Sequence, residues 1–173
     1  HFGSLVVSLA LLGFGLSSVV IFVVRGWFDR HWRGAAGTAL LLLGPLAVAA
    51  NLTAQAVPFN AIFLVSDPSQ VWRLAANFVL YLLPFLAGAM VLGIVFLRNR
   101  EGFGRVYFAD LVGSGVSGFV ILMAMYLLPP EQLIAVPLTL WMLSAILWFG
   151  LSEHVFGSLV SSVLGIACVG AYL

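Results

Sequence analysis

Six long apolar segments, separated by short stretches that hold most of the charged residues, make up this chain of 173 residues. A helix that crosses the ~30 Å hydrocarbon core of a bilayer needs about 20 mainly apolar residues, since each residue rises ~1.5 Å. Because lipid offers backbone N–H and C=O groups no partners, each segment should be helical. The pattern therefore predicts an all-α fold, a polytopic membrane helix bundle with about six transmembrane helices in one domain over residues 1–173. The expected spans are 2–24, 35–56, 71–97, 106–128, 133–151 and 158–173.

The stretches between these spans differ in character. Arg25–Gly34 and Arg98–Arg105 are polar, and we expect both to be loops. Val57–Gln70 is itself rather apolar, so we expect it to lie in the membrane interface as a short helix. Pro129 and Pro130 should end the fourth helix, because proline lacks the backbone N–H and clashes with the preceding turn.

The composition agrees with a membrane location and excludes several classes of function. Hydrophobic residues make up 63% of the chain and charged residues 8%, against about 25% charged in average soluble domains. A net charge of +1 gives no signal for binding a polyanion, so no nucleic-acid partner is predicted. Cys168 is the only cysteine, which excludes an intrachain disulfide and a cysteine metal cluster. The expected partners are the lipid bilayer and other membrane protein subunits.

The placement of arginine predicts an orientation. Six of the seven arginines lie in the two polar stretches Arg25–Gly34 and Arg98–Arg105, which fall on one side of a six-span path, and only Arg73 falls on the other. The positive-inside rule places those two stretches in the cytoplasm. We therefore expect the N-terminus to lie outside.

The fourth span contains an unusual number of small residues. Gly113 to Gly118 match G-x-G-x-x-G, but a dinucleotide site needs those glycines between a strand and a helix. Close helix packing is the favoured interpretation, because Ala109, Gly113 and Ser117 lie four apart on one helical face. The expected partner is the first span, in which Gly13 and Ser17 have the same spacing.

Polar residues near the span ends are the candidate binding positions. Asp110 is an acid within a span, and it indicates either a proton- or cation-coupling site or, as favoured here, a charge near the helix start paired with Arg105 or Arg98. Arg73 and Asn77 lie four apart and could bind an anionic group. The favoured interpretation is that Arg73 reaches the lipid headgroups or pairs with Asp67.

No Ser/His/Asp set, paired-carboxylate site or metal-ligand cluster occurs in the sequence, so it predicts no catalytic residue, cofactor or metal. The chain starts at His1 and stops at Leu173 within an apolar segment. We therefore expect a processed product or, in preference, the ordered part of a longer polypeptide.

Three stretches carry a resemblance to a known family. They are Ser8–Ser18, Val57–Arg73 continuing into Tyr81–Gly88, and Gly104–Gly115. Together they resemble the membrane-embedded half of bacterial spermidine-synthase-like proteins, in which a multi-span region is joined to an aminopropyltransferase-like domain. The resemblance extends from the start of the chain to about Leu128, and it places Arg105, Tyr107 and Asp110 at motif positions.

The resemblance implies only the membrane part of such a protein. The soluble domain of the family has a Rossmann-like methyltransferase fold that would bind decarboxylated S-adenosylmethionine, and it needs a strand, a Gly-rich turn and acidic residues for the polyamine. None of these lies in this sequence, so no catalytic residue can be transferred to it.

Three functions are consistent with these features. The preferred hypothesis is a non-catalytic membrane module that acts as a structural or anchoring subunit in a larger membrane assembly. The second is the membrane domain of an aminopropyltransferase-like enzyme. The third is half of a small-solute or polyamine transporter, although a cationic substrate should be met by several acids and only Asp110 is available.

Overall fold

The computed structural model describes residues 2–57, 67–152 and 155–172, and these contain six helices and no strand. The predicted all-α class is therefore confirmed, and each helix falls on one of the six apolar segments. The helices are α1 (Phe2–Val23), α2 (Arg25–Ala56), α3 (Ser69–Arg98), α4 (Phe103–Leu127), α5 (Ala135–Leu151) and α6 (Val155–Gly170). The predicted interfacial helix at Val57–Gln70 falls mainly on residues 58–66, outside the described residues.

The predicted loop Arg25–Gly34 is wrong, because this segment is the first part of α2. α2 bends at His31, whose φ of −117° and ψ of 22° are not helical. The segment is rich in charged residues, but it also has an apolar face. Phe28 is buried, and Trp32, four residues later, packs beside it in the same cluster. A polar segment with apolar residues four apart can thus form a helix that lies against the bundle.

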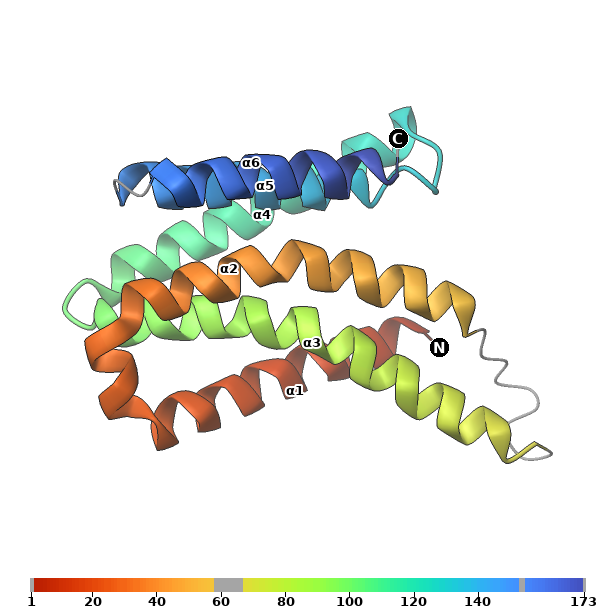
Figure 1. Cartoon of the computed structure of the whole chain (residues 1–173), viewed down its shortest axis with the longest axis horizontal. Coiled ribbons are helices and arrows are strands. Elements are labelled where there is room, and N and C mark those ends of the chain that lie inside the picture. Colours follow the sequence, from red (N-terminus) through yellow and green to blue (C-terminus); the bar gives the residue numbers. More distant parts are fainter. Residues whose placement is uncertain (1, 58–66, 153–154, 173) are drawn as a thin grey trace.

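Five of the six helices form two groups that share α2 (Figure 1). α1 and α3 pack with α2 on one side, and the hairpin of α5 and α6 packs on its other side. α4 runs diagonally behind them, from the end of α3 to the start of α5. The start of α1 and the end of α6 lie at the same end of the bundle.

Each group has its own apolar core. In the first, Ile21, Phe28, Ala35, Ala36 and Ile94 join α1, α2 and α3. In the second, Leu40, Leu138, Trp141, Ala145 and Cys168 join α2, α5 and α6. Trp148 packs against both cores, and its ring meets that of Trp32 edge to face at 6.3 Å. α2 is therefore the element through which the two groups are held together.

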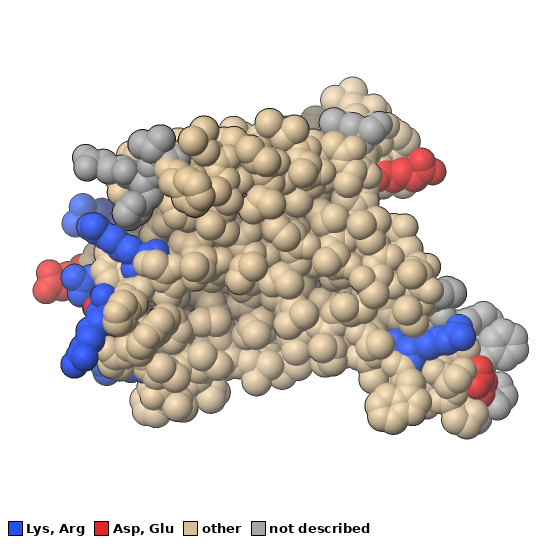
Figure 2. Space-filling model, viewed as in Figure 1, with Lys and Arg blue, Asp and Glu red and all other residues tan. Residues whose placement is uncertain are grey.

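Charge is confined to the two ends of the face seen in Figure 2, and the surface between them is uncharged. Large apolar side chains cover the outside instead: Phe22, Tyr126 and Leu151 are each at least 79% exposed. Three helices, α2, α3 and α4, are long and apolar enough to cross a membrane; in the described residues the apolar parts of α1, α5 and α6 are shorter. The structure thus has membrane-compatible helices, and the number six for the spans stays a prediction.

Candidate functional site

α4 is the helix least engaged with the rest of the chain. Of its 25 residues only Ala124 is buried. A Cβ added at Gly113, Gly115 or Gly118 would meet no atom within 4 Å outside the helix's own neighbouring backbone. Its packing contacts are mainly with α3 and α5. α4 therefore presents an open surface over most of its length.

The predicted contact between Gly113 of the fourth span and the first span is wrong. Gly13 and Ser17 of α1 are indeed a packed face, but their partner is α3, where the position of a Gly13 Cβ lies 3.1 Å from Cβ of Phe85. The small face of α1 is thus already occupied by α3. Ala109 and Gly113 are exposed and Ser117 is half-buried, and no atom of a neighbouring helix in the described residues lies within 4 Å of the Gly113 Cβ position.

Three predicted site residues lie near the start of α4. Tyr107 stacks on Phe103, with ring centroids 6.0 Å apart and an interplanar angle of 7°. Asp110 is half-buried, and the expected pairing with Arg105 or Arg98 is absent: within the described part of the chain, no ion pair of 4.0 Å or less involves it. Arg105 is exposed and lines a polar cleft.

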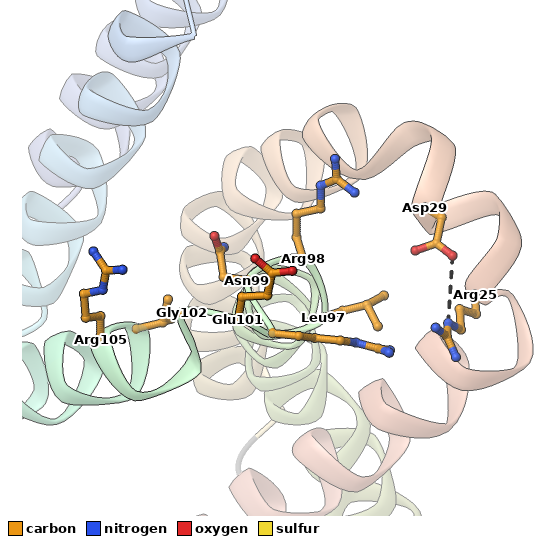
Figure 3. Close-up of a pocket in the computed structure, with 10 residues that line it drawn as sticks. Arg25, Asp29, Leu97, Arg98, Asn99, Glu101, Gly102 and Arg105 are labelled. Carbon is orange, nitrogen blue, oxygen red and sulfur yellow. Dashed lines mark ion pairs between the residues drawn. The ribbon is translucent and has the colours of Figure 1, made fainter.

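This polar cleft, called here the arginine cleft, has a volume of about 720 Å³. It is formed by the start of α2, the α3–α4 connection and the first turn of α4, and its lining residues are Arg25, Asp29, Leu97–Gly102, Arg105 and Val106. Figure 3 shows Arg25 and Asp29 facing each other on α2 and Arg105 on the opposite side of the cleft, with Arg98 between them. Two segments far apart in the sequence thus gather four arginines around one space.

The arginines of the cleft are only partly neutralised. Arg25 Nε lies 3.8 Å from an Asp29 carboxylate oxygen, one helical turn away, and both side chains are about half exposed. Exposed pairs of this kind contribute little energy. The Arg98 guanidinium lies over the Trp32 ring at 5.7 Å. In residues 2–57, 67–152 and 155–172, no carboxylate lies within 4.0 Å of Arg98, Arg100 or Arg105.

The other candidate pair, Arg73 and Asn77, lies near the opposite end of the bundle. The Asn77 amide donates to the backbone oxygens of Arg73, at 2.8 Å, and of Val57, at 3.1 Å. Its N–H groups therefore bond to α3 itself and to the end of the preceding helical segment. The pKa of Asp67 is lowered, mainly because its carboxylate accepts the Ser69 hydroxyl and backbone N–H, with a smaller contribution from the charge of Arg73. These residues build the start of α3 rather than an open site.

The sequence analysis did not predict two tight contacts between helices. On α6, Gly157, Ser161 and Gly165 lie four apart and face α5, where an added Cβ at Gly165 would collide with Met142. On α2, an added Cβ at Gly44 would collide with the Trp141 ring. The contact of α6 with α5 could have been predicted, because its small residues have the same four-residue spacing as those of α4.

In the described residues, no three side chains of His, Cys, Asp and Glu gather where they could hold a metal ion. The arginine cleft and the open surface of α4 are two features with which this chain can engage other molecules. No protein-family model, curated protein or solved structure matches the chain.

Proposed function

We propose that this chain is a non-catalytic integral membrane module that holds another membrane protein subunit against α4. The observation that carries the proposal is the open surface of α4, on which only Ala124 of 25 residues is buried. Small residues four apart let two helix backbones approach closely in lipid. Ala109, Gly113 and Ser117 provide such a face, and at Gly113 no other helix of the described residues lies against it. The hypothesis of a structural or anchoring subunit fits these features.

The proposal includes a topology of six spans in a bacterial inner membrane. The start of α2 and the connection from α3 to α4 with its flanking helix turns, which hold Arg25, Arg30, Arg33, Arg98, Arg100 and Arg105, lie at one end of the bundle, and the start of α3, which holds Arg73, lies at the other. This asymmetry supports a cytoplasmic location for Arg25–Gly34 and Arg98–Arg105, with the start of α1 outside. The resemblance to the membrane half of spermidine-synthase-like proteins supports a common origin with that family.

Labelling of single cysteines in a Cys168→Ser background tests this topology. Gly26→Cys and Asn99→Cys place thiols at exposed positions of the two arginine-rich segments, and Glu131→Cys places one at the other end. We expect a membrane-impermeant maleimide to label Glu131→Cys in intact cells, and Gly26→Cys and Asn99→Cys only after the membrane is opened. Labelling of positions 26 and 99 from opposite sides would contradict the topology.

The subunit hypothesis is tested by Gly113→Leu. Overpacking a close contact costs about 1–3 kcal/mol, so this variant should retain several-fold less partner than the wild type. Gly15→Leu is the matched control, because Gly15 is also an open glycine but lies on α1. The measurement is the amount of co-extracted subunit after mild-detergent extraction from the native membrane, by native mass spectrometry.

Two outcomes would contradict the subunit hypothesis. One is a wild-type chain that leaves the membrane without any partner protein. The other is a Gly113→Leu variant that keeps as much partner as Gly15→Leu. Polyamine flux into reconstituted vesicles that is lost in Asp110→Asn would favour the transporter hypothesis instead.

A further inference from the structure

An apolar groove, called here the lateral groove, adjoins the arginine cleft. This lateral groove has a volume of about 570 Å³ and lies between α1, α3 and α4. Its walls are largely apolar, and they include Phe14, Ile21, Leu92, Phe96 and Phe103. Leu97 and Arg100 line both the groove and the cleft, so the two spaces meet at these residues.

The serine hydroxyls of the groove are already used within their own helix. Ser17 and Ser18 both donate to the backbone oxygen of Phe14, at 2.9 and 2.8 Å. On the other wall, Phe96 and Phe103 lie with their ring centroids 5.2 Å apart and join α3 to α4. Apart from the half-buried Asp110, which also lines it, the groove therefore offers mainly hydrocarbon and aromatic surface to an occupant.

The length of the groove is close to the depth of one leaflet of a bilayer. Along α3 it extends from Leu97 to Ala89, eight residues earlier, and Arg100 lies in the turn beyond the end of the helix. At ~1.5 Å per residue this is about 12 Å, somewhat less than half of the ~30 Å hydrocarbon core. The part of an acyl chain nearest its headgroup can therefore lie along the groove while the headgroup is at the level of the cleft.

The charge of the cleft selects the headgroup. Four arginines and two acids, Asp29 and Glu101, line it, and Asp110 lines the adjoining groove, which leaves a formal excess of one positive charge for the two spaces together. Arg100 and Arg105 have no carboxylate within 4.0 Å among the described residues, so their guanidinium groups can bind phosphate oxygens. Basic pockets between helices at a membrane surface bind anionic lipid headgroups.

From this geometry we infer that the arginine cleft and the lateral groove together bind one anionic phospholipid, with its phosphate at Arg100 and Arg105 and an acyl chain between α1, α3 and α4. The site requires that the chain lies in a membrane. It does not require a partner on α4, so it can fail or succeed independently of the subunit hypothesis.

The test is native mass spectrometry of the purified full chain in a non-ionic detergent, with phosphatidylglycerol or phosphatidylcholine of identical acyl chains added. We expect phosphatidylglycerol to bind more tightly. Arg100→Gln with Arg105→Gln should weaken its binding about 10- to 30-fold, on ~1 kcal/mol for each arginine near an anionic lipid. Arg30→Gln with Arg33→Gln is the matched control, since it removes the same charge outside both spaces.

A second variant tests the groove separately from the charges. Ser18 is exposed and lines the groove, so Ser18→Trp should fill the space for the acyl chain without altering a buried position. We expect it to weaken phosphatidylglycerol binding while all arginines remain. Glycerol phosphate at the same concentration should not displace the lipid, because it lacks the chain that the groove holds.

Several results would overturn the inference. They are equal binding of the two lipids, equal losses in the two double-arginine variants, unchanged binding in Ser18→Trp, or displacement by glycerol phosphate. The last result would indicate a site for a soluble phosphate compound. Far-UV circular dichroism of each variant confirms that a loss of binding is not a loss of the helical fold.

Discussion

Trp141→Ala is expected to lower the free energy of unfolding by about 3–5 kcal/mol, the range for removing a buried large aromatic side chain. Trp141 of α5 is 6% exposed, and its indole Nε1 donates to the backbone oxygen of Leu40 on α2 at 2.6 Å. Its ring lies against Gly44, one turn further along α2. This contact joins the hairpin of α5 and α6 to the other group of helices, so its loss should separate the two groups.

The measurement is unfolding in mixed micelles of increasing SDS content, followed by far-UV circular dichroism. Trp72→Ala is the control, because Trp72 is 76% exposed and should change the unfolding free energy little. Gly44→Val places a Cβ where the indole ring of Trp141 lies, so it should destabilise the same contact between α2 and α5 by a change on α2. Equal stability of Trp141→Ala and Trp72→Ala would show that this joint does not hold the two groups together.

Gly165→Leu is expected to have the second large effect. It should lower the free energy of unfolding by about 1–3 kcal/mol or more, because it overpacks the contact of α6 with α5. Even a Cβ at Gly165 would collide with the side chain of Met142, and Ser161, one turn earlier, is fully buried. The close approach of the two helices leaves no volume for a larger residue. The α5–α6 hairpin should therefore loosen in this variant.

Gly113→Leu provides the matched control for the fold. The same glycine-to-leucine substitution is made in a row of small residues with the same spacing, but Gly113 has open space around it. In the same SDS titration we expect Gly165→Leu to unfold at a lower SDS content than the wild type. Gly113→Leu should unfold at the same SDS content as the wild type. If the two variants lose equal stability in the isolated chain, the assignment of α4 as the open helix is incorrect.

Two rows of small residues, one on α4 and one on α6, show what the sequence could predict about the site. Ala109, Gly113 and Ser117 and the α6 residues Gly157, Ser161 and Gly165 have identical spacing. Spacing alone identifies a helix face that can be approached closely, but not whether a helix of this chain approaches it. Likewise, the arginines of Arg25–Gly34 and Arg98–Arg105 were expected on the same side, yet nothing in their order indicated a shared cleft.

The sequence by itself determined that the chain is all helical and where its apolar segments lie. Each such segment must satisfy its own backbone hydrogen bonds in lipid, and this demand is local, so it can be recognised from the length and hydrophobicity of one stretch. Only the tertiary structure decided that Arg25–Gly34 is helical, that Gly13 packs on α3, and that Asp110 has no ion-pair partner among the described residues. These features depend on which side chains meet across helices, and close packing is decided by the shape of both partners at once.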